Sequence, residues 1–234
     1  MDTTASFKKL EHHCREEDYA GHCKFDALNS PLLETLFGSL SLTRLLVTQA
    51  VNRIPLPLRS IFGVSKGRNP KGIANFIRGY SGFLKTDPSD ETRAILMSLS
   101  DWLFQNHSSI KGAYDGPGLA WGYHFPWQSP GFFASRHAPN CIVTTFCGEA
   151  LLQAYLATKS SRYLEGARET RRFILEALPV IEETKDKKCI GYVTHGLKWR
   201  VININAVAAG FLAKLAKVER NEELMNQARK MVNW

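Results

Sequence analysis

Apolar side chains recur along this chain at intervals of three and four residues, the spacing that places them on one face of an α-helix. The first such run covers 31–49 and starts at Pro31, a residue favoured at the first position of a helix. No segment alternates clearly between apolar and polar residues, so the pattern predicts an all-α protein. Further helices are predicted after Pro70 and Pro88 and at 142–157, 161–178, 206–217 and 222–234.

The predicted helices form a weak internal repeat of helical pairs. The repeat is clearest around Phe83, Tyr155 and Leu215, which are 72 and 60 residues apart. Long loops at 112–140 and 179–203 precede the first helix of the later copies, and loops of this length tend to be functional. We therefore expect antiparallel helical hairpins whose long loops, rich in Gly, Pro and aromatic residues, gather at one end.

The charge of the chain is concentrated in one region. Lys and Arg number 30 against 22 Asp and Glu, a formal net charge of +8. No acidic residue occurs from Thr35 to Thr86, and this window contains Arg44, Arg53, Arg59, Lys66, Arg68, Lys71, Arg78 and Lys85. Such a surplus indicates an anionic partner: phosphate, nucleic acid, acidic sugar or a membrane surface. The alternative is an ordinary solvated helix face.

The sequence lacks a secretory signal, a membrane-spanning run and a metal-binding motif, and these absences guide what we expect for its cellular compartment and its cofactors. The first residues contain no apolar secretory core, and no run of apolar residues is long enough to predict a membrane-spanning helix. Five scattered cysteines do not suggest a disulfide framework, so we expect a cytoplasmic protein. The His and Cys residues near the N-terminus lack the spacing of zinc ligands, so we expect no metal and no other cofactor.

Five short segments resemble a known protein family. They are Asp26–Pro31, Lys66–Lys71, Trp121–Ser129, Pro139–Phe146 and the Asn-Ile-Asn-Ala run at 203–206. With them the chain resembles the poorly characterised (α/α)-toroid proteins encoded in polysaccharide-biosynthesis clusters. That family is related to six-hairpin glycosidases, sugar epimerases and terpenoid-cyclase-like toroids.

The resemblance implies a partial toroid. Such toroids close with about six hairpins, and the repeat predicts about half that number here. We therefore expect an N-terminal arm at 1–30, one incomplete toroid domain at 31–234, and self-association or a companion chain that completes the ring. The resemblance also implies an acidic residue before the Trp127–Gln128 pair, where this chain has Pro126. That departure leaves catalysis open.

The loop at 112–140 offers groups that suit a sugar ring, because sugars stack on aromatic faces and bind directional hydrogen-bonding partners. The candidate ligand-binding residues here are Trp121, Tyr123, Trp127, Gln128 and Asn140. Asn203 and Asn205 join them because of the family resemblance. The alternative is that these aromatic residues anchor the loop against the helix ends.

Two kinds of sugar chemistry are available to the candidate catalytic residues. Glycoside hydrolysis usually needs two carboxyl groups, and Asp115 and Glu149 are the candidates, with Asp26 as a further one. Glu149 could instead complement a helix dipole, and Asp26 could fix a turn. Epimerisation would use His124 and His195 as general acid and base.

The segment Lys66–Lys71 joins the family resemblance to the charge surplus. Its glycine lets the backbone approach an anion, while Arg68, with Asn69 and Lys71, could bind phosphate or carboxylate. The segment lacks the pattern of a nucleotide-binding phosphate loop. The alternative is an exposed basic turn that precedes a helix.

These features favour a carbohydrate-handling toroid associated with exopolysaccharide or cell-surface glycan biosynthesis. Its expected partner is an anionic or phosphorylated glycan, or a sugar phosphate, bound at the rim of a central cavity. Any enzymatic activity would resemble that of a glycoside hydrolase, a lyase or a sugar epimerase. The alternative function is a non-catalytic helical scaffold that binds a protein through its concave face. No nucleic-acid-binding motif is present, so nucleic acid is not an expected partner, and a peripheral membrane contact is the remaining option for the basic segment.

Overall fold

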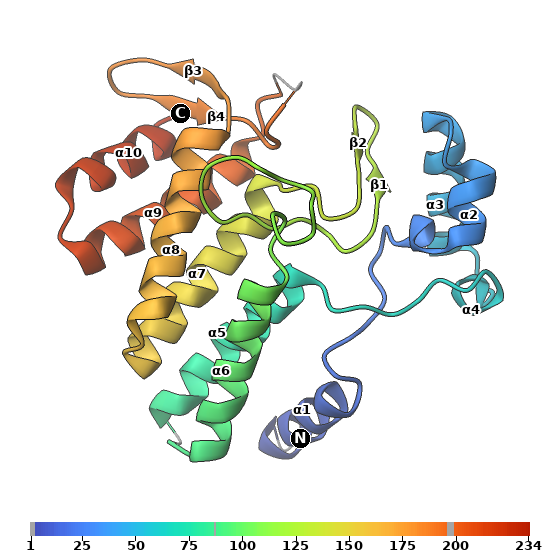
Figure 1. Cartoon of the computed structure of the whole chain (residues 1–234), viewed down its shortest axis with the longest axis horizontal. Helices are drawn as coiled ribbons and strands as arrows, with labels where there is room; N and C mark the ends of the chain where they lie inside the picture. The colour runs from blue at the N-terminus through green and yellow to red at the C-terminus, as the bar shows by residue number, and fades with distance from the viewer. Residues whose placement is uncertain (1–2, 87, 196–198) are drawn as a thin grey trace. The chain divides into compact units, whose positions relative to one another are not determined.

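The computed structural model describes residues 3–86, 88–195 and 199–234, and it divides into two compact units (Figure 1). The first unit contains the chain up to Gly72 together with Tyr123–Arg136. The second unit contains Ile73–Gly122 and His137–Trp234. This division differs from the expected arm at 1–30, because residues 31–72 group with the N-terminal residues rather than with the hairpins.

The second unit consists of three helical hairpins, in agreement with the predicted repeat (Figure 1). The first helices of the hairpins are α5 (Pro70–Thr86), α7 (Cys141–Thr158) and α9 (Ile202–Glu219). The second helices are α6 (Asp90–Gln105), α8 (Ser161–Arg172) and α10 (Glu222–Val232), and a π-turn at Phe173–Ala177 extends α8. Because α7 contacts α6, α8 and α9, it lies at the centre of the array.

Helices α7 and α9, the first helices of the second and third hairpins, end in the same way and begin at equivalent positions. Helix α7 is capped at its N-terminus by Asn140, and both α7 and α9 end at a residue in the left-handed region, Lys159 (φ 62°) and Arg220 (φ 53°). The residues that precede the two helices, Asn140 and Val201, are 61 positions apart. The residues that follow them, Lys159 and Arg220, are also 61 positions apart. The structural repeat is therefore 61 residues, one more than the sequence pattern suggested.

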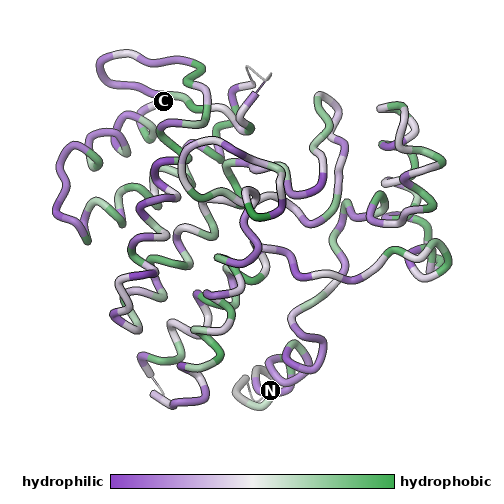
Figure 2. The backbone as a smooth tube through the Cα atoms, viewed as in Figure 1, coloured by the Kyte–Doolittle hydropathy of each residue, from purple (hydrophilic) through white to green (hydrophobic). Residues whose placement is uncertain are grey.

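One large core cluster of the second unit lies between α7, α8, α9 and α10. Helix α7 is apolar around its whole circumference, as expected for a helix with neighbours on several sides. Figure 2 shows that α9 is largely hydrophobic, whereas α10 is more hydrophilic. Among the described residues, α7 alone is long and apolar enough to cross a membrane, but more than half of it is buried inside the protein. A core helix passes the same test, so this is weak evidence for a membrane span.

Two short β-hairpins occur where the sequence pattern predicted only loops. Strand β1 (Trp127–Gln128) pairs with β2 (Phe133–Ala134), and β3 (Val180–Glu183) pairs with β4 (Lys188–Ile190), both antiparallel. Strands of two to four residues are too short for a periodic pattern to be visible. The second hairpin packs against α10, and the protein remains all-α in class.

The first unit contains an N-terminal helix, α1 (Thr3–Glu16), and a group of helices with a small core formed by Ala27, Leu33, Val51 and Val64. This group consists of a 3-10 turn at Ala27–Asn29, α2 (Pro31–Phe37), α3 (Ser41–Arg53) and α4 (Leu58–Ile61). The single helix predicted at 31–49 is thus two helices. Helix α2 ends at Phe37 with Gly38 as its C-cap, and Leu40 is extended before α3 begins. The spacing of apolar residues continues through this interruption of the helix.

Candidate functional site

Three charged side chains, one from the first helix of each hairpin, meet at the middle of α7. Glu149 of α7 is nearly buried. Lys214 of α9 donates a short hydrogen bond to its carboxylate, and Arg78 of α5 lies 3.6 Å from the same oxygen. Arg78 also lies over the ring of Phe146, 5.9 Å from its centroid. We call Arg78, Glu149 and Lys214 the Glu149 cluster.

The Glu149 cluster carries two positive charges and one negative charge. The cations are partly exposed, with 39% and 52% of the Arg78 and Lys214 side chains accessible, whereas 12% of the Glu149 side chain is accessible. A net positive charge on partly exposed cations attracts anions. Sequence reasoning selected Glu149 but missed its two partners. Arg78 and Lys214 lie on the first helices of the neighbouring hairpins, and this position in the repeat could have been used to predict them as partners of Glu149.

The long loops of the second unit meet at the N-terminus of α7, as expected. The backbone N–H of Asn140 donates to the carbonyl of Trp121 (3.2 Å), and that of Cys141 donates to the carbonyl of Tyr192 (2.8 Å). The side-chain oxygen of Asn140 accepts from the N–H of Val143 (3.0 Å) and so caps the helix. Its side-chain nitrogen is buried and has no hydrogen-bond partner among the described residues. The two N–H groups of the Asn140 side chain are therefore available to a water molecule or a ligand.

Trp121 is a core residue in this structure, which corrects its expected role as a sugar platform. Its side chain is fully buried, and the indole N–H donates to the carbonyl of Leu103 (2.9 Å). The hydroxyl of Thr144 bonds with both its backbone N–H (2.9 Å) and its carbonyl (3.0 Å). A buried ring with a satisfied N–H has no face to offer a ligand.

Asn205 is likewise a structural residue rather than an exposed ligand group. Its side chain is buried and accepts from the N–H of Ile190 (3.0 Å). It also donates to the carbonyls of Lys188 (2.7 Å) and Met231 (2.9 Å), and so ties β4 to the end of α10. Asn203, two residues earlier, is exposed in the first turn of α9 and stays a candidate.

The remaining candidates of the second unit lie on its surface. Asp115 is exposed in the loop that follows α6. His195 is also exposed, and its Nδ1 is 3.0 Å from the hydroxyl of Thr194. The structure thus brings neither residue into the Glu149 cluster, and the catalytic roles of Asp115 and His195 stay predictions.

The aromatic candidates of the first unit form a cluster of rings. Tyr123 stacks on Phe125 (centroids 5.3 Å apart) and meets Trp127 edge-on at 6.0 Å, while Trp127 also contacts Phe25 and Phe132. Both Tyr123 and Trp127 are half-buried, and burial raises the pKa of the Tyr123 phenol. This packing favours the alternative that the rings anchor the loop.

Gln128 and His124 are held by specific contacts within the first unit. The Gln128 side chain is buried. It accepts from Arg44 (2.8 Å) and donates to the carbonyls of Ser129 and Phe132, so both of its N–H donors are used within the first unit. The ring of His124 lies against Gly67, where a Cβ atom would come within 2.6 Å of it. His124 belongs to the first unit and His195 to the second, so their predicted pairing stays a prediction.

The basic loop 66–71 is largely neutralised by the end of α1 and the residues after it. Arg68 donates to the carbonyl of Asp18 (2.7 Å) and forms a short ion pair with its carboxylate, and Lys66 pairs with Glu17. The hydrogen bond and charge of Lys66 lower the pKa of Glu17. The stretch from Thr35 to Thr86 contains no acidic residue, but in the folded chain Glu17 and Asp18 lie beside its cations.

The other polar groups of this region also have partners inside the first unit. Asn69 donates to the sulfur of Cys23 (3.1 Å) and accepts from the N–H of Lys71 (3.0 Å). Asp26 is buried and pairs with Arg59 (3.0 Å), which supports the structural reading of that carboxylate. Within the part of the chain that the structure describes, no group of three or more His, Cys, Asp or Glu could hold a metal ion.

Comparison with known proteins identifies the fold. No family model and no curated protein matches the sequence. Solved structures do match: the GH76 alpha-mannanase BT2949 of Bacteroides thetaiotaomicron has 12% identity and a TM-score of 0.50, over 71% of this chain and 44% of that one. D-mannose isomerase has 15% identity and a TM-score of 0.51, over 90% and 56%. Cellobiose 2-epimerase of Bacillus thermoamylovorans B4167 has 9% identity and a TM-score of 0.51, over 89% and 57%.

These similarities confirm the predicted fold, since the matching proteins are (α/α)-toroids. The chain spans about half the length of the structures it matches. Three hairpins that cover about half of a toroid agree with the partial toroid expected from the repeat. At this level of identity the likeness concerns the fold alone.

Proposed function

We propose that this chain is a carbohydrate-handling protein that binds an anionic or phosphorylated glycan on the face formed by the first helices of its hairpins. The observation that carries the proposal is the Glu149 cluster, to which all three hairpins contribute. The names of the similar solved structures, a mannanase, a mannose isomerase and a cellobiose epimerase, support a sugar as the ligand.

The chemistry of the Glu149 cluster suits such a ligand. Arg78 can bind two oxygens of a phosphate or carboxylate through its planar guanidinium group, and Lys214 adds a second, mobile positive charge. Glu149 holds both cations in place and, as an acceptor, can bind a sugar hydroxyl. Because the cluster offers one carboxylate and glycoside hydrolysis usually needs two, binding is the function that it supports best.

The biological setting remains part of the proposal. We infer that the protein acts in the cytoplasm on glycans made for export or for the cell surface. The described cysteines are all free, which supports a reducing compartment. The family resemblance supports the link to polysaccharide synthesis.

The proposal is tested by calorimetric titration with mannose 6-phosphate and glucuronate, with mannose and glucose as neutral controls. We expect the anionic sugars to bind more tightly at low salt, because exposed charges are screened by ions. The double variant Arg78→Gln, Lys214→Gln should lose at least about tenfold in affinity, since each lost charge-assisted hydrogen bond contributes about 1.5–3 kcal/mol.

The matched control is Lys217→Gln, which removes an exposed charge from the same helix outside the cluster. Circular dichroism verifies that each variant is folded. If the double variant binds as tightly as the unmodified chain, the Glu149 cluster is not the anion site. If neither anionic sugar binds more tightly than the neutral sugars, the anionic-glycan proposal is wrong.

A further inference from the structure

Helices α2 and α3 of the first unit expose leucine side chains to solvent. Hydrophobic positions recur along both helices in Figure 2. Each of five leucines is between 52% and 65% exposed: Leu32 and Leu36 on α2, Leu40 in the turn that follows, and Leu42 and Leu46 on α3. We call these five residues the leucine surface.

Leu42 and Leu46 lie on the side of α3 that faces away from the core of the first unit. They are four residues apart and therefore share one side of the helix. Val47 and Val51 pack in the small core, and the helical period places them on the opposite side of α3. A helix that is apolar on opposite sides is typical of one that is covered on both. The core covers one side, so we expect a second contact at the leucine surface.

The charges along this pair of helices are positive. Residues 35–61 contain three arginines and no acidic residue. Arg53 is exposed at the end of α3, about three helical turns after Leu42, so it lies on the same side of the helix. Neither Arg53 nor Arg44, near the start of α3, pairs with a carboxylate among the residues that the structure describes. Uncompensated cations therefore border the leucine surface.

Arg44 is held beside the turn that contains Leu40. Its guanidinium group donates to the carbonyl of Gly38 in that turn (2.6 Å). Glu34, the acidic residue that precedes the stretch, lies 3.8 Å from Arg136, so its charge is balanced within the first unit. The leucine surface thus combines exposed aliphatic side chains with a positive edge.

This combination matches the interface of a membrane with anionic lipids. Leucine side chains can be buried at the boundary between headgroups and acyl chains, while arginines bind the headgroup phosphates. Protein interfaces are instead enriched in Tyr and Trp, and residues 35–61 contain neither. The chemistry of the surface therefore favours lipid over a protein partner.

We propose that the leucine surface of α2 and α3 inserts into the interfacial region of a membrane that contains anionic lipids. The contact is made by these helices and not by the basic loop, where Glu17 and Asp18 compensate the charges of Lys66 and Arg68. The inference does not depend on the proposed glycan binding. The leucine surface belongs to the first unit and the Glu149 cluster to the second, so separate variants test the two proposals.

The test is cosedimentation of the full chain with vesicles of phosphatidylcholine that contain about 30% phosphatidylglycerol, and with vesicles of phosphatidylcholine alone. We expect saturable binding that is at least about fivefold stronger to the anionic vesicles. The double variant Leu42→Gln, Leu46→Gln should lower the partition coefficient at least about tenfold, because it removes apolar area that the membrane would bury. Arg53→Gln should lower it about fivefold, and only on anionic vesicles.

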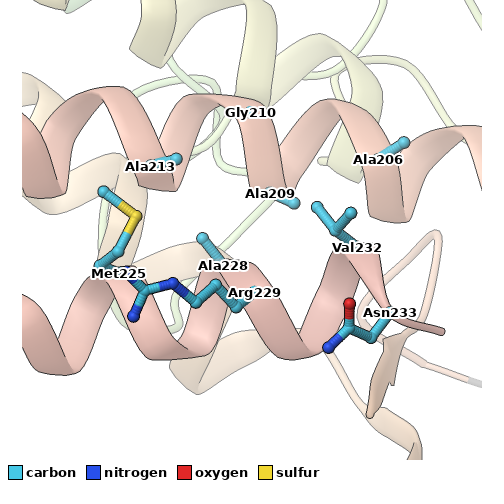
Figure 3. Close-up of a pocket in the computed structure, with 9 residues that line it drawn as sticks. All are labelled: Ala206, Ala209, Gly210, Ala213, Met225, Ala228, Arg229, Val232 and Asn233. Atoms are coloured by element: carbon cyan, nitrogen blue, oxygen red, sulfur yellow. The ribbon is translucent and has the colours of Figure 1, made fainter. Parts of the chain in front are cut away.

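The matched control is the double variant Ile202→Gln, Val232→Gln in the second unit. Both residues are at least as exposed as the leucines, and Val232 borders the open groove between α9 and α10 (Figure 3). This variant should bind vesicles as the unmodified chain does. An equal loss in the control, or no binding of the unmodified chain to anionic vesicles, would overturn the proposal.

Two measurements without vesicles distinguish a membrane from other occupants of the leucine surface. Unfolding in urea should show that Leu42→Gln, Leu46→Gln is as stable as the unmodified chain. A lower urea midpoint would mean that these leucines pack against another part of the chain, and the proposal would be wrong. A dimer in sedimentation velocity that the same variant dissociates would assign the surface to a second copy, which also contradicts it.

Discussion

The ring of Phe211 on α9 occupies the space beside Gly148 on α7, and a side chain at position 148 would collide with it. A Cβ atom there would lie 2.9 Å from the Phe211 ring and 2.4 Å from the Cγ2 of Thr170 on α8. Gly148 is therefore a point of close contact between α7, α8 and α9. This relationship fixes how the second and third hairpins stack.

Substitution Gly148→Ala should destabilise the protein, although alanine favours a helix by about 1 kcal/mol over glycine. Overpacking of a close-packed core typically costs about 1–3 kcal/mol, so we expect a net loss in the free energy of unfolding, measured in urea. Gly210→Ala is the matched comparison on α9, where nothing lies within 4 Å. It should stabilise the protein by about 0.5–1 kcal/mol. Equal effects of the two changes would contradict the packing described for Gly148.

Asn205→Ala should destabilise the second unit by about 1–3 kcal/mol or more, because buried partners of the Asn205 side chain would lose their hydrogen bonds. Hydrogen exchange should show faster exchange at the amide of Ile190, which donates to Asn205. Asn203→Ala, at an exposed position on the same helix, should change stability by less than about 0.5 kcal/mol. A loss of glycan affinity in Asn205→Ala at unchanged stability would instead favour a ligand role.

Stability should fall as the pH drops below the usual pKa of histidine because of His107. Burial lowers the pKa of His107 from its ordinary value of 6.5, so the folded state holds this ring neutral while the unfolded state protonates it. The stabilisation from the neutral ring is present above pH 6.5 and is lost as the pH falls below that value. The melting temperature at pH 7.5 and at pH 5.5 checks this. The difference should be smaller in His107→Gln, and an identical pH response in the variant would disprove the role of His107.

Arg68→Ala should leave the affinity for mannose 6-phosphate within about twofold, because Asp18 already occupies the guanidinium group of Arg68. Calorimetric titration of this variant beside the Arg78 and Lys214 variants compares the two basic sites directly. A loss of tenfold or more in Arg68→Ala alone would move the anion site from the Glu149 cluster to the basic loop.

The helical hairpins could be predicted from the sequence because their signals are periodic. Proline at the start of α5, the apolar spacing in α9 and α10, and the repeat around Tyr155 and Leu215 all follow from local chemistry. The end of α2 at Gly38 and the two short β-hairpins leave no periodic signal in the sequence. The spacing of apolar residues therefore predicted neither the helix end nor the strands.

The candidate site was harder to predict because burial and partners are properties of the folded chain. Trp121 and Asn205 have the composition of ligand-binding residues, yet their hydrogen bonds are made inside the core. Arg78 and Lys214 look like ordinary surface cations until the fold places them on either side of Glu149. Sequence spacing cannot reveal ion pairs that join residues more than 60 positions apart.

The ion pairs of Glu17 and Asp18 make the segment around α1 an intramolecular cover for the basic loop. Each of these carboxylates balances one cation, Lys66 or Arg68. A chain that begins after residue 20 would lose both carboxylates and expose two uncompensated charges beside Lys71. Such a truncated protein should adhere to polyanions such as heparin far more strongly than the full chain does. The charges of Lys66 and Arg68 are thus compensated in the full chain, because the N-terminal segment supplies the carboxylates that pair with them.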